Sequence, residues 1–249
     1  MAHLADLHRV IVTCERCPRL RQYCQRIARE KKRAHRDDVY WGRPVPGFGD
    51  PNARLLLVGL APAAHGANRT GRVFTGDGSG DFLMSALHRT GFANINTSQR
   101  VDDGLKLTDA YILSAVRCAP PDNKPLPEEI TRCLDHLEVE LTHLPRVRVV
   151  VALGKIGFDA WLQLLKRGGV TRSPRPQFGH GEVVTFDDSA DARRGGPSAF
   201  AEASADKSGP LPALIGCYHP SRQNTNTGKL TAPMMESVFR KAKKLIEVG

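Results

Sequence analysis

Long apolar runs are missing from this sequence of 249 residues. No run approaches the ~20 apolar residues that a helix needs to cross a bilayer, so we expect no membrane-spanning segment. The first residues, MAHLADLHRVIVTCERC, also lack the continuous apolar core and the small-residue cleavage site of a signal peptide. These absences favour a cytoplasmic protein.

A Walker-type phosphate loop is missing as well. The segment GLAPAAHGANRTGRVFTGDGSGDFL, residues 59–83, is rich in glycine and follows the apolar run RLLLVGL. It contains no G-x-x-x-x-G-K-[ST] pattern, and its last glycines lie far beyond the tight strand-to-helix turn that holds a phosphate. The loop is therefore predicted to bind something other than a nucleotide phosphate.

Acidic residues are fewer than basic ones. The chain has 36 Lys and Arg against 26 Asp and Glu, which gives a formal net charge of +10. The excess favours a polyanionic partner such as nucleic acid, although a basic soluble protein without such a partner would show it too. Residues 2–34 have a helical pattern, broken near Cys17-Pro18, with a basic stretch that is either a DNA contact or a solvated face. That stretch includes Arg26, Arg29, Lys31 and Lys32.

Strand and helix patterns alternate along most of the chain. Four apolar runs are typical of buried parallel strands: residues 54–60, 110–116, 147–154 and 213–219. Helical patterns are found at 80–90, 127–143, 155–167 and 231–247. The alternation predicts one open, mainly parallel sheet with helices on both faces, and the functional loops of such a sheet gather at the carboxyl ends of its strands.

Six cysteines in an intracellular protein do not favour a disulfide framework, because thiols are kept reduced inside cells. Cys14 and Cys17 form a chelating pair, and Cys118 and Cys133 form a looser one. Four thiolates of this kind hold either an iron–sulfur cluster or zinc. Alternatively, Cys118 and Cys133 are small buried hydrophobic residues. Cys24 and Cys217 are predicted to be ordinary core residues.

Four blocks of the sequence, taken together, resemble the iron–sulfur uracil-DNA glycosylases, closest to the family-5 (type-B) branch. They are the two cysteine pairs, GLAPAAHGANRTGRVFTGD, VRCAPPDNKP and HPSRQNTNTGKLT. The resemblance covers nearly the whole chain except residues 187–210. It implies an α/β fold, a three-layer α/β/α sandwich around a four-stranded, mainly parallel sheet, with a [4Fe–4S] cluster on Cys14, Cys17, Cys118 and Cys133.

The resemblance also implies a function. We expect a monofunctional glycosylase that hydrolyses the N-glycosidic bond of deaminated bases in double- and single-stranded DNA, without a strand-cleaving lyase step, and so initiates base-excision repair. We expect a monomer with a single domain over residues 1–249, a helical N-terminus (1–34) anchored by the cluster, and a flexible insertion at 187–210. The alternative is a non-catalytic iron–sulfur module that binds nucleic acid. A hydrolase of a small nucleotide is disfavoured by the net charge.

A base flipped out of a duplex needs a snug pocket with backbone donors and a stacking ring. The small residues of 59–66 let the main chain approach the base, and Phe74 supplies an aromatic face unless it is only a core anchor. The predicted base-binding residues are Gly59, Ala61, Ala63, Ala64, His65, Phe74 and Ser114.

Cleavage of the C1′–N bond leaves a cation-like sugar and an anionic base, so the site needs a carboxylate near the sugar and donors near the base. Asp77 is the candidate carboxylate, although it is alternatively a helix cap, for which Asp81 is better placed if the helix begins near Gly80. His219 is the candidate donor to the base, or a structural histidine. Asn123 either holds water or reads a base edge, or forms a turn.

Several positions depart from the uracil-specific relatives. Ala61 and Leu60 stand where two branches have an acidic residue, Ala63 replaces the tyrosine that excludes thymine, and Ser114 replaces the asparagine that reads uracil. These changes predict a wider pocket that also admits hypoxanthine and xanthine, with Asp77 as the catalytic carboxylate.

The DNA itself is predicted to contact two loops. Lys155 lies at a predicted helix start, where the helix N-terminus favours a phosphate. The loop after His219 carries polar side chains that would enter the space left by the flipped nucleotide. Its candidate residues are Ser221, Arg222, Gln223 and Asn224.

Overall fold

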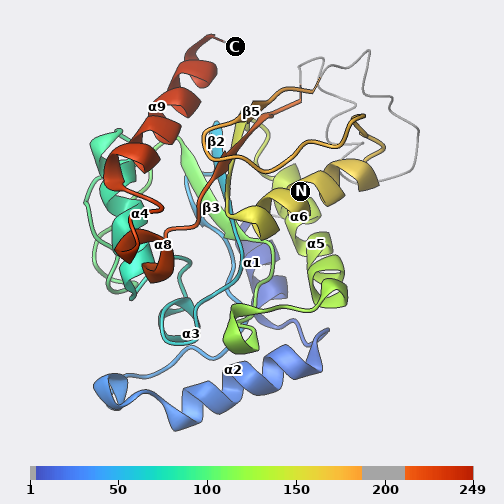
Figure 1. Ribbon diagram of the computed structural model, residues 1–249. Coiled ribbons are helices and arrows are strands. Elements are labelled where there is room, and N and C mark those ends of the chain that lie inside the picture. The colour runs from blue at the N-terminus through green and yellow to red at the C-terminus, as the bar shows by residue number, and fades with distance from the viewer. Residues whose placement is uncertain (1–3, 187–210, 249) are drawn as a thin grey trace.

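The computed structural model describes residues 4–186 and 211–248 (Figure 1). The insertion expected at residues 187–210 lies outside the described residues. The helices, in chain order, are α1 (Leu4–Val12), α2 (Pro18–Glu30), α3 (Ala67–Thr70), α4 (Gly78–Arg89), α5 (Pro127–Thr142), α6 (Lys155–Arg167), α8 (Arg222–Asn226) and α9 (Ala232–Val248). Short 3-10 turns form at Arg33–His35 and Pro121–Asn123. Within the described ranges, no helix is both long enough and apolar enough to span a membrane.

The sheet has six strands, so the prediction of four strands is wrong in number. The strands are β1 (Phe48–Gly49), β2 (Leu55–Gly59), β3 (Ala110–Ser114), β4 (Val149–Leu153), β5 (Val183–Val184) and β6 (Ala213–Cys217). Their order is β1-β3-β2-β4-β6-β5. The inner four are parallel and correspond to the four predicted runs, whereas β1 and β5 pair antiparallel at the two edges. A two-residue edge strand is too short to leave a periodic pattern in the sequence.

Helices cover both faces of the sheet, which confirms the α/β/α sandwich. Alternate residues of a strand point to opposite faces, and all five residues of β2 are buried. Leu55 and Leu57 join the core beneath α4 and α9, whereas Leu56 and Val58 join the core beneath α5 and α6. Figure 1 shows α4 and α9 on one side of the sheet and α5 and α6 on the other. Because β2 is covered on both faces, its sequence is continuously apolar rather than alternating.

The N-terminal helices pack outside this sandwich. The chain breaks between α1 and α2 at Thr13–Cys17, as the Cys17-Pro18 step predicts, because proline is tolerated only in the first turn of a helix. Arg19 of α2 pairs with Glu129 of α5 at 2.7 Å. In Figure 1, α2 crosses the molecule beyond α3, at the edge where the parallel strands end. The four loops that follow β2, β3, β4 and β6 lie at this same edge.

Candidate active site

The end of β2 forms one wall of the site. Gly59 has no side chain, and a Cβ there would lie 2.9 Å from Cε2 of Phe74 and 3.6 Å from Oγ of Ser114. The absence of a Cβ therefore lets the Phe74 ring lie against the strand end. Phe74 has φ of +48°, a conformation that is costly for a bulky residue and is concentrated at functional sites. Gly59, Phe74 and Ser114 thus come together, as the sequence predicts for a base pocket.

The ring of His219 lies near the Phe74 ring. The two ring centroids are 5.9 Å apart with planes tilted by 34°. The imidazole is packed over Gly154, where a Cβ would be 3.3 Å from the Cβ of His219. Burial lowers the pKa of His219 to about 4. The side chain is therefore neutral at physiological pH, with one ring N–H as donor and no charge.

Asp77 caps helix α4 with one oxygen and keeps the other free. Oδ1 accepts the backbone N–H groups of Ser79 and Gly80 at 2.9 and 3.0 Å. The helix begins at Gly78, so the expectation that it begins near Gly80 with Asp81 as cap is wrong. Asp81 instead accepts the backbone N–H of Ser98 at 3.1 Å. The helix starts earlier because the Asp77 side chain accepts the first free backbone N–H groups, and this outweighs the low helix propensity of Gly78 and Gly80.

The second oxygen of Asp77 faces Gly66. A Cβ on Gly66 would overlap Oδ2, so glycine is required at this position for the carboxylate to fit. Within the described residues, Oδ2 accepts no hydrogen bond. Burial raises the pKa of Asp77, and this outweighs the lowering by the two capping N–H groups and by Arg222. Asp77 is thus both a cap and a half-buried carboxylate with one available oxygen.

The loop after β6 places Arg222 beside this carboxylate. A Cβ on Gly78 would lie 3.5 Å from Nε of Arg222, so the guanidinium covers the first turn of α4. Ser221 caps α8 by accepting the N–H of Asn224. Asn224 donates through its side chain to the carbonyl of His219 at 2.9 Å, so it braces the loop instead of extending outward. Arg222 and Gln223 are exposed.

Other residues of the 60–66 loop have different neighbours. Ala63 lies beside Gly66, with its Cβ 3.2 Å from the position of a Cβ there, and so lies close to the Asp77 carboxylate. Ala64 accepts the side-chain N–H of Asn68 at its carbonyl. Ala61 packs against the apolar cluster that contains Cys118 and Cys133. The structure therefore brings Ala63 to the candidate pocket but gives Ala61 a packing role.

His65 turns toward the N-terminal segment. Its Nδ1 lies 3.0 Å from the hydroxyl of Tyr40, and burial followed by the charges of Lys32, His35 and Arg69 lowers its pKa. Arg69 donates to the carbonyls of His65 and Gly76, which clamps the two ends of the loop together. Tyr40, Gly66 and Arg69 were missed by sequence reasoning, since nothing in a tyrosine, a glycine or an arginine within a polar loop signals such contacts.

Asn123 and Lys155 are not part of this arrangement. Asn123 is exposed in the turn after β3, with φ of +56°, which fits the alternative of a turn-forming residue. Across the described residues it makes no contact with Asp77 or His219. Lys155 is exposed at the start of α6 and pairs with Asp159 at 2.5 Å. Lys155 lies at a helix N-terminus, as predicted, but the carboxylate of Asp159 partly neutralises its positive charge.

Five of the six cysteines, all except Cys217, lie where α2, α5 and the end of β3 converge. All six are free, and Cys17, Cys118 and Cys133 belong to one apolar cluster with Leu20 and Ile130. Cys24 is buried, as expected of a core residue, but it also lies beside Cys118, and a hydrogen bond between the two thiols lowers its pKa. Cys217 is buried in β6. In the part of the chain that the structure describes, no three His, Cys, Asp or Glu side chains are arranged around a single metal-ion position.

A buried ion pair lies next to these cysteines. The backbone N–H of Arg117 donates to Sγ of Cys133 at 3.2 Å. Its guanidinium pairs with Glu140 at 2.5 Å, and both side chains are almost fully buried. Glu140 also accepts the hydroxyl of Tyr111 at 2.6 Å. The pair fixes α5, and with it Cys133, against the end of β3, because separating two buried charges would be strongly destabilising.

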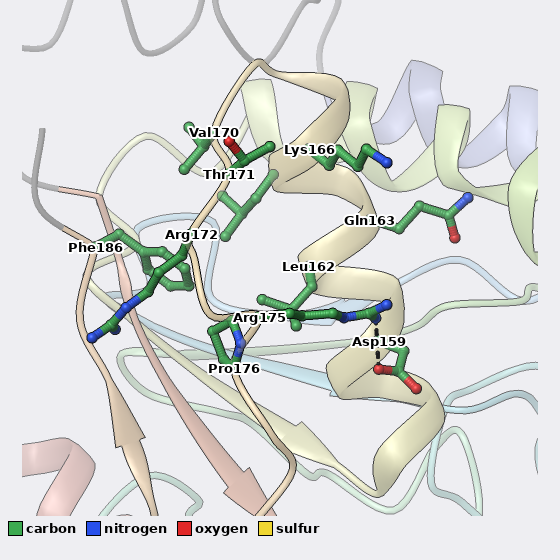
Figure 2. A pocket seen from close by; sticks show the side chains of 11 residues that line it. Asp159, Leu162, Gln163, Lys166, Val170, Thr171, Arg172, Arg175, Pro176 and Phe186 are labelled. Atoms are coloured by element: carbon green, nitrogen blue, oxygen red, sulfur yellow. Dashed lines mark hydrogen bonds and ion pairs between the residues drawn. The ribbon is translucent and has the colours of Figure 1, made fainter. Parts of the chain in front are cut away.

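The cavity in Figure 2 is separate from this site. It has a volume of about 550 Å³ and lies between α6 and residues 170–176. Its apolar floor includes Leu162 and Phe186, and Figure 2 shows Arg175 reaching across it to Asp159. None of the predicted site residues lines this cavity, so it is not part of the candidate active site.

Comparison with known proteins identifies the family. The model of the uracil DNA glycosylase superfamily matches residues 46–243. A "Type-5 uracil-DNA glycosylase" of Mycobacterium tuberculosis is 45% identical over 243 residues, covering 97% of this chain and 81% of the relative. One of Thermus thermophilus is 46% identical over 238 residues, 94% of each chain. A "Type-4 uracil-DNA glycosylase" of Pyrobaculum aerophilum is 31% identical over 165 residues, 66% of this chain and 67% of the relative. Together with the fold, these similarities show that the chain belongs to the uracil DNA glycosylase superfamily.

Proposed function

We propose that this protein is a monofunctional DNA glycosylase that removes uracil, and also hypoxanthine and xanthine, from DNA and so initiates base-excision repair. The observation that carries the proposal is a neutral imidazole, His219, packed near the Phe74 ring, together with Asp77, a carboxylate three residues after Phe74 that keeps one oxygen free. The relatives named as uracil-DNA glycosylases support uracil as a substrate. The wider range is supported by the small side chains at Ala63 and Ser114.

In the proposed reaction the flipped base stacks on the Phe74 ring beside His219. The C1′–N bond breaks, and its electron pair leaves with the base. The N–H of neutral His219 donates to the anionic base, while the Asp77 carboxylate offsets the positive charge of the sugar. Water then adds to C1′ and its proton passes to Oδ2 of Asp77. Preorganised groups of this kind lower the barrier because they need no rearrangement as charge develops.

The direct test uses purified protein and duplexes that each carry one uracil, hypoxanthine or xanthine. Alkaline treatment cleaves the abasic sites that excision leaves. A glycosylase yields cleaved strand only after alkali, whereas a non-catalytic binding module yields none with any base. Cleavage before alkali would instead indicate a lyase step, which the proposal excludes.

A [4Fe–4S] cluster on Cys14, Cys17, Cys118 and Cys133 is part of the proposal. Four cysteines are the usual ligand set of such a cluster. The thiols fit this role chemically, because none is in a disulfide and Cys133 already accepts an N–H at its sulfur. The residues come from the turn before α2, the end of β3 and α5, so a shared cluster would join these three elements. Its role would be structural.

The cluster proposal predicts brown protein with broad absorption near the boundary of the visible and the ultraviolet. Cys133→Ser is expected to lose most of the iron, because it removes a ligand. Cys217→Ser is the matched control and should keep the full iron content, since Cys217 is buried in β6, apart from the other thiols. Colourless protein with stoichiometric zinc would contradict the assignment.

DNA binding is predicted to be strongly salt-dependent and largely independent of sequence. Basic side chains that neutralise phosphates release counterions, so affinity falls as salt rises, with a slope of roughly 0.9 per phosphate contact on duplex DNA. Lys155→Ala should weaken binding to every duplex and flatten this slope by about one contact. Lys166→Ala, at the other end of the same helix, is the control and should leave the slope unchanged. Binding that is indifferent to salt would contradict the proposed basic footprint.

A further inference from the structure

A second concave surface lies between α2 and the segment Trp41–Arg43. The cavity has a volume of about 270 Å³. The α2 side contributes Arg21, Gln25 and Arg29, and the facing segment contributes Trp41 and Arg43. No Asp or Glu is among its lining residues. We refer to this surface as the Trp41 pocket. It is made of an aromatic ring and arginines, and it shares no residue with the site around Phe74.

The indole of Trp41 is held rigidly although it is exposed. Its Nε1 donates to the carbonyl of Pro44 at 3.1 Å, and its backbone N–H donates to the carbonyl of Arg69 at 2.9 Å. Gly71 covers one ring face, since a Cβ there would lie 2.9 to 3.1 Å from three ring atoms. The residue is nevertheless 36% exposed. A large ring held in place by hydrogen bonds, with part of its surface exposed, provides a stacking surface with little entropy left to lose.

Two of the three arginines that line the pocket form no ion pair within the described residues. The guanidinium of Arg43 lies 5.8 Å from the centroid of the Trp41 ring. Arg21 is committed to the structure, because it pairs with Glu15 and donates to the carbonyl of Gly42. Arg29 and Arg43, in contrast, have no carboxylate partner within residues 4–186 and 211–248. They are therefore available to an anion that approaches the exposed ring.

We propose that the Trp41 pocket binds one nucleotide of an unpaired DNA strand. The base would stack on the indole, and its phosphate would lie between Arg29 and Arg43. Aromatic platforms combined with basic grooves bind single strands in this way, because every unpaired base offers a free ring face. The interior of a duplex offers no such face, so a backbone contact alone would use the arginines but leave the rigid ring without a function.

The pocket is linked to the loop that carries Phe74 and Asp77. Tyr40, which precedes Trp41, contacts His65 at the start of that loop, and Gly71 lies three residues before Phe74. A strand held at Trp41 would therefore run close to the candidate active site. The inference does not depend on base excision, because strand binding can be measured with undamaged DNA.

Tryptophan fluorescence provides a specific readout. The chain has two tryptophans, and the second, Trp161, is fully buried. Emission that responds to a stacked base therefore comes from Trp41. We expect an undamaged oligothymidylate to quench the emission of the intact protein, and a blunt duplex of the same length to quench it much less. The Trp41→Phe variant should lose the response, because only the buried indole remains.

Affinities measured by anisotropy with a labelled oligothymidylate complete the test. Trp41→Ala is expected to weaken single-strand binding by on the order of 10-fold and to leave the affinity for a blunt duplex unchanged. Arg43→Ala should also weaken single-strand binding. Because this variant keeps the Trp41 ring, it tests the proposal even if Trp41→Ala fails to fold. Lys244→Ala, which removes an exposed positive charge on α9 outside the pocket, is the control and should have little effect. Absence of quenching, or equal losses for single strand and duplex, would overturn the proposal.

Discussion

Asp77→Asn is expected to lower the single-turnover rate of uracil excision by on the order of 10² to 10³, the usual loss for one preorganised electrostatic group. The carboxylate is expected to act twice, by offsetting the charge of the sugar and by accepting the proton of the attacking water. Asparagine keeps an oxygen that can cap α4 through the N–H groups of Ser79 and Gly80. The substitution therefore removes the charge and leaves the cap in place.

Two control variants separate catalysis from stability. Asp77→Ala removes the cap as well, which typically costs about 0.5 to 2 kcal/mol of stability, so its melting temperature should fall whereas that of Asp77→Asn should not. Asp81→Asn neutralises the neighbouring carboxylate, which bonds Ser98 instead of the pocket, and should excise at nearly the wild-type rate. Wild-type speed in Asp77→Asn would reduce Asp77 to a helix cap and leave His219 as the main catalytic candidate.

The pH dependence of the excision rate provides a second test of the role of Asp77. Because burial raises its pKa above the usual value, the carboxylate loses its charge at a higher pH than an ordinary aspartate does. As the pH is lowered, the rate of excision should therefore begin to fall at a pH above the usual pKa of aspartate. His219, with a pKa of about 4, stays neutral over most of that range. The acid decline should disappear in Asp77→Asn, and its persistence would assign it to another group.

The same histidine affects stability in acid. An unfolded histidine titrates near its usual value, and burial lowers the pKa of His219 to about 4. Between these two values the unfolded chain binds the proton and the folded chain does not, so stability falls as pH decreases through this window. Unfolding measured by denaturant at several pH values should show this loss, and His219→Gln should show less of it.

The sequence predicts the long elements of this fold well. The helix expected at 155–167 coincides with α6, and the four apolar runs contain the four parallel strands. These elements bury continuous apolar surface, which leaves a strong pattern. The edge strands β1 and β5 have two residues each and leave none. Their pairing depends on the neighbouring strands β3 and β6, which only the folded chain brings next to them.

The site was predicted less completely, for a similar reason. Motif reasoning selected Asp77, Phe74 and His219 as candidates, because each follows a strand or lies in a loop whose residue types suit the chemistry. It did not foresee that Gly66 makes room for the second oxygen of Asp77. A residue that acts by lacking a side chain cannot be found until the group that fills its space is known. The role of Asn123 stays a prediction, since the structure shows only that it is exposed in the turn after β3.

Ala63→Tyr is expected to reduce excision of hypoxanthine far more than excision of uracil. Ala63 lies beside Gly66 and thus close to the free oxygen of Asp77, so a phenol ring at this position would occupy part of the space that a purine needs. Steric exclusion is an effective way to discriminate between ligands because it requires no new hydrogen bond. A pyrimidine is smaller and should still fit.

The decisive quantity is the ratio of the single-turnover rates on two duplexes, one with uracil and one with hypoxanthine. A ring close to Asp77 would also slow both reactions to some extent, and the ratio cancels that common loss. Ala63→Val provides an intermediate size, so the ratio should change in the order Ala, Val, Tyr if volume is the cause. An unchanged ratio in both variants would mean that Ala63 does not border the base. The breadth of the pocket would then depend on Ser114, which lies beside Gly59.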